Sequence, residues 1–297
     1  MTDRSLSGLY PILSMPFDEK GRIDVEDLER EVEFAIGAGA DGLGIAMASE
    51  IFKLSEIERD LALKTVVQKA NGRVKVVMHT GAQGTDLAIG YSRQAELLGA
   101  DAVMVTPPTL LPMPPEETVE FFRRLSKALS IPIFVQDIAN APVPPELAAC
   151  IVQEAENACY VKVEVPPTTP RVAEARRLGG ERLIAFGGAG GRELIGELRN
   201  GAAGTMPGCA LTDVFRHVWD TYHKGLQAEA DILLTRHMPL LDMYKESLDV
   251  SYHLTKELLR LRGVFKTVHV RHPTVTPNQE AFRRIQRMAA ELGLVSS

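Results

Sequence analysis

The chain has 297 residues, of which 45% are hydrophobic and 24% charged, the profile of an ordinary globular protein rather than of a disordered or fibrous one. Its 33 basic and 39 acidic residues give a formal net charge of -6, which argues against nucleic acid as the main partner and favours small molecules. Cys150, Cys159 and Cys209 show no CxxC spacing, so we expect neither a disulfide framework nor a zinc cluster, and a reducing compartment is the simpler inference.

The length of the chain is compatible with one large domain or with a domain plus an appendage. Barrels of the α/β type reach this length as single domains. The N-terminal segment MTDRSLSGLY lacks the apolar core of a signal peptide. No apolar run approaches the ~18 residues of a membrane span. We therefore expect a cytoplasmic protein that does not act at a membrane.

Short apolar runs alternate with segments of helical period from the start of the chain, which is the pattern of βα units around a parallel sheet. In the segment 24–40, hydrophobic residues recur every fourth position from Leu28, and acidic residues occupy the first turn. We expect Ser55 to cap the next helix and Gly72 to stop it. The eight predicted strands are 9–17, 42–48, 75–81, 101–108, 131–138, 159–165, 182–188 and 204–209.

The strand pattern ends near residue 210, and only helical segments follow. This order predicts a TIM-type (β/α)8 barrel over 1–210 as the catalytic domain and a C-terminal helical appendage over 211–297. No GxGxxG follows the first strand, which argues against a doubly wound dinucleotide fold. The loop FGGAGG at 186–191 follows the seventh strand, where amides such as that of Gly188 could bind an anion. An ordinary glycine-rich turn is an equal alternative.

Catalytic groups of such barrels lie at the carboxyl ends of the strands. These ends are marked in the sequence by a short set of polar residues. The set consists of Ser14, Ser49, Glu50, His79, Thr80, Thr106, Gln136, Asp137, Lys162, Glu164 and Thr205.

Lys162 is the strongest candidate, because period-two alternation in CYVKVEV places Tyr160, Lys162 and Glu164 together on the barrel-facing side. Burial lowers the pKa of a lysine, and a neutral amine can attack a ketone to form a Schiff base. A structural ion pair with Glu164 is the alternative. Glu164 is correspondingly either a proton shuttle or a counter-ion, and the pattern leaves both open.

Gln136 is the better candidate of the pair that closes the fifth strand, because a neutral amide can hydrogen-bond a substrate without the cost of burying a charge. His79 could be a general acid or base, although a lone histidine at a strand end is more often structural. The amides of the MASE segment, Met47 to Glu50, could hold a carboxylate with the hydroxyl of Ser49, or form an ordinary helix start. No His, Asp and Glu cluster has metal-ligand spacing and no GxSxG occurs, so we expect a mechanism without metal or cofactor.

These features resemble the dihydrodipicolinate synthase / N-acetylneuraminate lyase family. The resemblance covers nearly the whole chain and rests on five segments in the family's order, namely YPILSMPFDEKGRID, GADGLGIAMASEIFKLSEIERD, GADAVMVTPP, IPIFVQD and YVKVE. It implies a homotetrameric TIM barrel with C-terminal helices. It also implies a small-molecule 2-keto acid as substrate and a Schiff-base lysine on the sixth strand, here Lys162.

Several family positions differ in this sequence. Gln136 stands where the synthase and the sialate lyase have a catalytic tyrosine, and Met47 and Ala48 replace a pair of threonines. The tyrosine expected after TP is replaced at Pro108-Thr109. These differences argue against lysine-biosynthetic synthase activity and against sialate cleavage.

The sequence is more similar to the 2-keto-3-deoxy-L-arabonate dehydratase branch, through VQD, K-x-E on the sixth strand, SE after the second strand and RHP at 271–273. This resemblance implies a 2-keto-3-deoxy sugar acid bound as an imine at Lys162, which loses a proton from C3 and the C4 hydroxyl as water. Glu164 or a bound water would then move protons, and Gln136 would orient the substrate.

We expect the substrate carboxylate to meet the Ala48-Ser49 loop. Asp137, Gly188 and His79 complete the predicted substrate-binding set. A retro-aldolase acting on a similar acid, or a non-catalytic barrel, are the alternatives.

Overall fold

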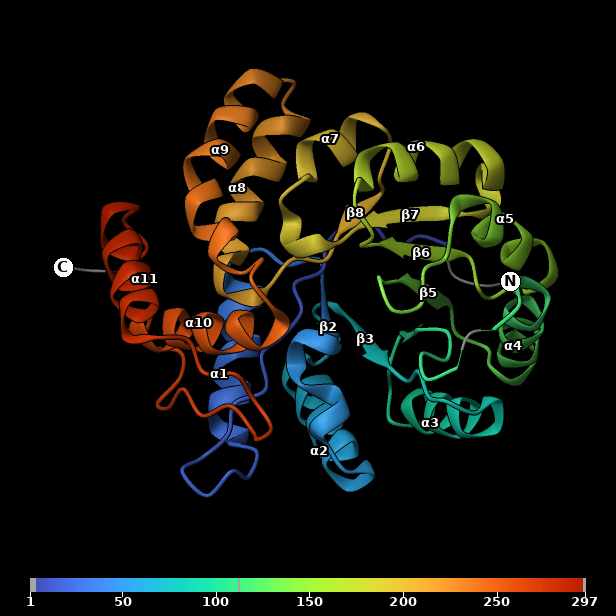
Figure 1. The fold of residues 1–297 in the computed structure, drawn as a ribbon, viewed down its shortest axis with the longest axis horizontal. Helices are drawn as coiled ribbons and strands as arrows, with labels where there is room; N and C mark the ends of the chain where they lie inside the picture. The colour runs from blue at the N-terminus through green and yellow to red at the C-terminus, as the bar shows by residue number, and fades with distance from the viewer. Residues whose placement is uncertain (1–3, 112, 296–297) are drawn as a thin grey trace. The chain divides into compact units, whose positions relative to one another are not determined.

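The computed structural model describes residues 4–111 and 113–295, in which eight strands alternate with helices along the chain (Figure 1). The chain divides into two compact units. The first comprises Met1–Tyr10 and Lys75–Met206, and the second comprises Pro11–Val74 and Pro207–Ser297. This division differs from the expected boundary at residue 210, because the second unit combines the C-terminal helices with an early part of the chain. The catalytic domain over 1–210 therefore stays a prediction.

The first unit contains a parallel sheet with the strand order β1-β8-β7-β6-β5-β4-β3. Neighbouring helices of this unit pack against each other in chain order, from α3 to α7. The strands are β1 (Gly8–Leu9), β3 (Lys75–His79), β4 (Ala102–Val105), β5 (Ile133–Asp137), β6 (Tyr160–Val163), β7 (Ile184–Gly187) and β8 (Gly204–Thr205). The helices are α3 (Thr85–Leu97), α4 (Pro115–Ala128), α5 (Pro145–Glu154), α6 (Thr168–Gly179) and α7 (Leu194–Arg199).

The second unit contains β2 (Gly42–Ile45) and Ile12, which forms isolated parallel bridges to Gly44 and Gly208. Within it, α1 packs on α2, α8 on α9, and α10 on α11. Its helices are α1 (Val25–Gly37), α2 (Glu56–Ala70), α8 (Thr212–His223), α9 (Gln227–Met243), α10 (Leu248–Leu261) and α11 (Gln279–Glu291). Short 3-10 turns, η1 (Met47–Ser49) and η2 (Ile51–Lys53), connect β2 to α2.

The order of elements confirms the predicted (β/α)8 fold class with a C-terminal helical extension, since eight βα units precede α9, α10 and α11. Ser55 caps α2 as expected, in a capping box with Glu58. The predicted strand 9–17 is wrong beyond Leu9, because the regular strand ends there. Pro11 and Pro16 lack the N–H that a continuing ladder needs.

An aromatic layer fills the inner side of the sheet in the first unit. Phe134 and Tyr160 stack with ring centroids 4.5 Å apart, and Phe186 meets both rings edge-on at 5.1 and 5.9 Å. Tyr10 adds a further edge contact to Phe186 at 5.5 Å. Because side chains alternate along a strand, this layer shows that Lys162, two residues after Tyr160, faces the same inner side.

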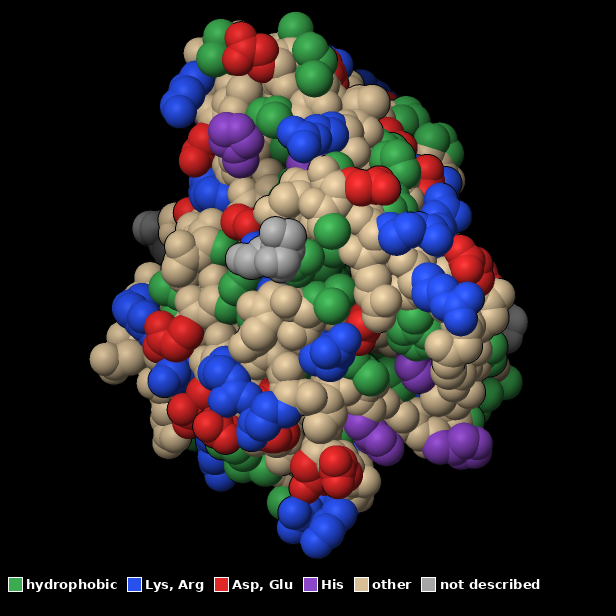
Figure 2. Space-filling model, turned by 90° about the vertical axis from the view of Figure 1, so that its left-hand side faces the viewer, with side chains coloured by type: hydrophobic (Ala, Val, Ile, Leu, Met, Phe, Trp, Pro, Cys, Tyr) green, Lys and Arg blue, Asp and Glu red, His purple; other side chains and the backbone are tan. Residues whose placement is uncertain are grey.

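Charges of both signs are mixed on the face of the molecule that Figure 2 shows, where Lys and Arg side chains alternate with Asp and Glu. The second unit also has ion pairs within single helices, as in Arg216 with Asp220 on α8 and Arg260 with Glu257 on α10. The surface field there is therefore locally balanced. Within the described part of the chain, none of the helices has the length and apolar character needed to cross a membrane.

We expect Tyr160→Phe to destabilise the first unit without disturbing its aromatic layer. The Tyr160 hydroxyl accepts a hydrogen bond from the buried backbone N–H of Leu6 at 3.0 Å. Removing the acceptor leaves that donor without its partner, at a cost of about 1–3 kcal/mol. Urea unfolding of both proteins measures the free energy of unfolding, and an unchanged value would contradict the assignment of this bond.

Candidate active site

The three residues predicted as catalytic lie together in the first unit. Lys162, in the middle of β6, is 4% exposed, and its Nζ lies 3.0 Å from Oε1 of Glu164. Gln136 is the partner of Lys162 on β5 in the strand register. Its Nε2 donates a hydrogen bond to Oε2 of Glu164 at 2.6 Å. The Glu164 carboxylate therefore bridges an amine and an amide through its two oxygens.

Lys162 has apolar surroundings on the side that faces the aromatic layer. Its register partner on β7 is Phe186, which belongs to the aromatic layer. A 3.0 Å contact suits either an ammonium paired with a carboxylate or an amine bonded to a carboxylic acid. The geometry thus brings the amine of Lys162 and the carboxyl group of Glu164 into contact, which both alternatives from the sequence require.

Gly188 allows Glu164 to take this position. A Cβ atom at residue 188 would lie 2.4 Å from Cγ of Glu164 and 3.0 Å from the carbonyl oxygen of Val163, so any side chain there would displace the carboxylate. The next three residues, Ala189 to Gly191, all have left-handed φ angles, of 48°, 71° and 77°. An anion-binding role for the amides of this loop stays a prediction.

Asp137 is engaged elsewhere in the first unit. Its Oδ1 accepts a bond from the amide of Val143 at 2.8 Å, and Oδ2 pairs with Arg171 of α6 at 2.8 Å. Burial raises the pKa of Asp137, and these two partners oppose the rise. His79, at the end of β3, lies 3.5 Å from the hydroxyl of Thr106 through Nε2. These contacts favour structural roles, and substrate binding by either residue stays a prediction.

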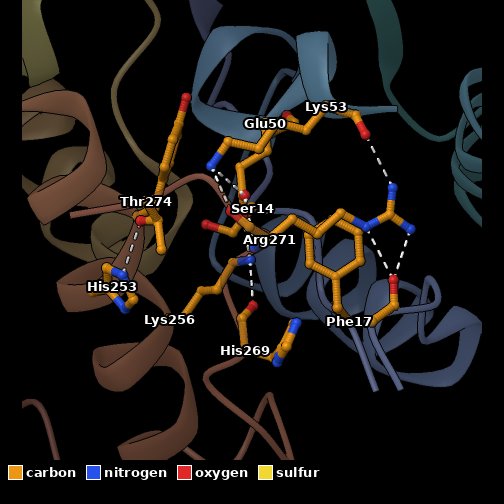
Figure 3. Close-up of polar contacts among 12 residues, drawn as sticks. Ser14, Phe17, Glu50, Lys53, His253, Lys256, His269, Arg271 and Thr274 are labelled. Carbon is orange, nitrogen blue, oxygen red and sulfur yellow. Dashed lines mark hydrogen bonds and ion pairs between the residues drawn. The ribbon is translucent and has the colours of Figure 1, made fainter. Parts of the chain in front are cut away.

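Ala48 and Ser49 lie in η1 of the second unit. The Ser49 hydroxyl donates to the carbonyl of Leu13 at 2.5 Å and accepts from the amide of Ala46 at 3.1 Å. The hydroxyl thus holds the loop's backbone in shape, so a carboxylate at this loop would be bound mainly by backbone amides. Glu50, which follows, is fully buried among the side chains of Lys53 and Lys256 (Figure 3). The sequence marked Glu50 as a strand-end residue and as part of the MASE segment, and it did not predict the two lysine partners.

A further buried carboxylate, which interacts electrostatically with Glu164, was not predicted from the sequence. Glu197 of α7 is 0% exposed, and its Oε2 lies so close to Gly187 that a Cβ there would be 1.7 Å away. Burial raises the pKa of Glu197 to about 7; Glu193 and Glu164 add to this, and the hydroxyl of Thr168 opposes it. The sequence feature that could have indicated this burial is the position of Glu197 beside Leu198, on the apolar side of a short helix.

Among the described residues, no group of three or more His, Cys, Asp or Glu side chains is placed to hold a metal ion. The polar groups that the structure brings together are the amine of Lys162 on β6, the carboxylate of Glu164 just after β6, and the amide of Gln136 on β5.

The model of the dihydrodipicolinate synthetase family matches residues 5–292 of the chain. The chain belongs to this family. Members with named activities among its relatives are lyases and synthases, and the protein is a lyase of the family.

Relatives of the family differ in how much of this chain they match. An L-2-keto-3-deoxyarabonate dehydratase from Azospirillum brasilense is 31% identical over 273 residues, which cover 90% of this chain and 88% of the relative. An N-acetylneuraminate lyase from Citrobacter koseri is 33% identical over 137 residues, 46% of each chain. A dihydrodipicolinate synthase structure from Thermotoga maritima has a TM-score of 0.91, covering 98% of this chain and 99% of that chain at 20% identity, which supports the fold alone.

We expect Glu197→Gln to remove a pH dependence of stability. Because the pKa is about 7 in the folded protein and near 4.5 in the unfolded chain, the native state binds the proton more tightly. Stability from this group is complete below about pH 4.5 and is lost as the pH rises to about 7. The variant should match the wild type at pH 4 and exceed it at pH 8, by an amount on the order of 3 kcal/mol.

Glu193→Gln is the matched control, since Glu193 precedes the same helix and is exposed. It should change the free energy of unfolding little at either pH. Denaturant unfolding at the two pH values measures the difference, and parallel pH profiles for wild type and Glu197→Gln would refute the assignment.

Proposed function

We propose that the protein is a Schiff-base-forming lyase that dehydrates a 2-keto-3-deoxy sugar acid. The observation that carries the proposal is the contact of Lys162 with Glu164, oriented in turn by Gln136. The similarity to the Azospirillum dehydratase over 90% of the chain supports the substrate class.

In the proposed mechanism, Lys162 forms a covalent imine with the substrate. Its neutral Nζ attacks the C2 ketone, and the resulting carbinolamine loses its oxygen as water. The protonated imine is an electron sink, so the C3 proton becomes acidic enough for a modest base. The buried position of Lys162 and its adjacent carboxyl group suit this step.

Glu164 is the proposed carrier of protons. It removes the C3 proton, the electrons pass to the imine nitrogen as an enamine, and their return expels the C4 hydroxyl, which leaves as water with the proton that Glu164 supplies. A proton shift from C5 to C3 converts the unsaturated imine to the 5-oxo form, and hydrolysis of this imine consumes one water and frees Lys162. Overall the substrate loses one water and no electrons are gained or lost.

Gln136 is the proposed orienting group. Its Nε2 is bound to Glu164, and its Oε1 is buried without a hydrogen-bond donor among the described residues. That oxygen can accept a bond from a substrate hydroxyl. The amide cannot exchange protons as the family's tyrosine does, which leaves the proton transfers to the carboxyl group beside it.

Borohydride in the presence of pyruvate should reduce the imine and leave a stable adduct on Lys162. Mass analysis of the peptide that contains 160–164 locates it. Lys162→Ala should show no adduct and lose turnover by about a thousandfold or more. An unmodified Lys162 in the wild type, or full turnover by the variant, would eliminate every imine mechanism.

The products distinguish dehydration from aldol cleavage, which shares the imine and is the second candidate because of the similarity to a sialate lyase. With 2-keto-3-deoxy sugar acids, we expect a dehydrated acid such as a 2,5-dioxo acid. Pyruvate and an aldehyde would instead establish the aldolase.

Glu164→Gln should slow the reaction about 100-fold or more while pyruvate labelling of Lys162 persists, because only proton transfer is lost.

A further inference from the structure

A group of side-chain oxygens is buried on the helix-facing side of the sheet, behind the end of β7. Its centre is the carboxylate of Glu197, which is 0% exposed. A Cβ at Gly187 of β7 would lie 1.7 Å from Oε2 and 3.1 Å from Oε1 of Glu197, so the carboxylate packs directly against the strand. Helices α6 and α7 lie side by side over this part of the sheet, within the first unit (Figure 1).

Two threonine hydroxyls belong to the same group of oxygens. Thr205 of β8 is the register partner of Gly187, and such partners on neighbouring strands point to the same face of a sheet, about 5 Å apart. Thr168 begins α6, and its hydroxyl is close enough to the carboxylate of Glu197 to oppose the rise of its pKa. Thr205 is 0% and Thr168 2% exposed. The carboxylate and both hydroxyls are therefore shielded from solvent together.

These buried oxygens have no hydrogen-bond partner among the described residues. They are Oε1 and Oε2 of Glu197, Oγ1 of Thr168 and Oγ1 of Thr205. In the same part of the chain, no lysine, arginine or histidine forms an ion pair with Glu197, and the charged groups that raise its pKa are the acids Glu193 and Glu164. Buried polar groups of folded proteins are almost always satisfied by protein atoms, water or a bound ion. The partner of these oxygens is therefore expected to come from outside the chain.

Charge decides which partner is suitable. Water can bond the hydroxyls, but it leaves the charge of a buried carboxylate uncompensated, which is costly. A proton removes that charge at low pH, and a cation balances it at higher pH. Carboxylate and hydroxyl oxygens are ligands of hard cations, and divalent ions of this kind usually take several carboxylates. A single carboxylate such as Glu197 instead balances the charge of a monovalent cation.

We propose that Glu197, Thr168 and Thr205 bind a monovalent alkali cation, sodium or potassium, behind β7. The cation replaces the proton on Glu197, and the threonine hydroxyls supply part of its oxygen shell. Lys162 lies on the opposite face of the sheet, so binding of the ion needs no substrate and is independent of the proposed function. The stability gain expected for Glu197→Gln at pH 8 then applies to buffers without alkali cations.

Replacement of choline chloride by potassium or sodium chloride at constant ionic strength tests the proposal. At pH 8 the midpoint of thermal unfolding of the wild type should rise by about 2–5 °C with at least one alkali salt, because an ion that binds only the native state stabilises it. Proton and cation compete for Glu197, whose pKa is about 7. The half-saturating salt concentration should therefore be about tenfold higher at pH 6 than at pH 8.

Glu197→Gln removes the charge and keeps the shape of the side chain. Its unfolding midpoint should be the same in choline and in alkali salts. Glu193→Gln is the matched control, because Glu193 is exposed and acts on Glu197 only through space, so this variant should keep the shift of the wild type. An equal shift in Glu197→Gln and the wild type, or no difference between choline and either alkali salt in the wild type, would overturn the proposal.

Thr205→Val tests the ligand set and covers the case in which Glu197→Gln does not fold. It replaces the hydroxyl by a methyl group of similar size, and the half-saturating salt concentration should rise about three- to tenfold, as expected for one lost oxygen ligand. Thr205→Ser keeps the hydroxyl and should need the same salt concentration as the wild type. Equal half-saturating concentrations in the valine and serine variants would refute the assignment of this ligand.

Discussion

The contact between Lys162 and Glu164 is the interaction on which the proposed chemistry depends. The amine and the carboxyl group lie 3.0 Å apart at the end of one buried strand. Their contact depends on the neighbouring strands, which provide a hydrogen-bond partner for the carboxyl group and an apolar layer below the amine. Gln136 on β5 is the hydrogen-bond partner of the carboxyl group, and the aromatic residues of β5, β6 and β7 form the apolar layer. The parallel register of β5 with β6 and of β6 with β7 delivers both.

An amide stands at position 136, where the resemblance to the synthase and the sialate lyase implies a phenol, and the two groups differ in whether they can move protons. A phenol donates and accepts protons, whereas an amide only orients its neighbours by hydrogen bonding. In this protein the amide orients a carboxylate, and that carboxylate touches the amine. Under the proposed mechanism, the group that carries protons is therefore Glu164, which follows β6, rather than a side chain of β5.

The sequence predicted the features that depend only on residues close together in the chain. Alternation placed Lys162 and Glu164 on the inner face, and the capping role of Ser55 followed from its place just before a segment of helical period. Pairings between distant segments could not be read this way, such as Asp137 with Arg171 or Glu50 with Lys256, which are 206 positions apart. The raised pKa of Glu197 likewise depends on burial against Gly187, which a sequence does not display.

Gly188 has a consequence for how sequences of this kind can vary. The space that a Cβ at position 188 would occupy is filled by the side chain of Glu164. The two positions are therefore coupled by volume, and they can diverge only together. Homologues with a larger residue at 188 are expected to have lost the acid at 164, so this pair of alignment columns separates carboxylate-dependent members from the rest.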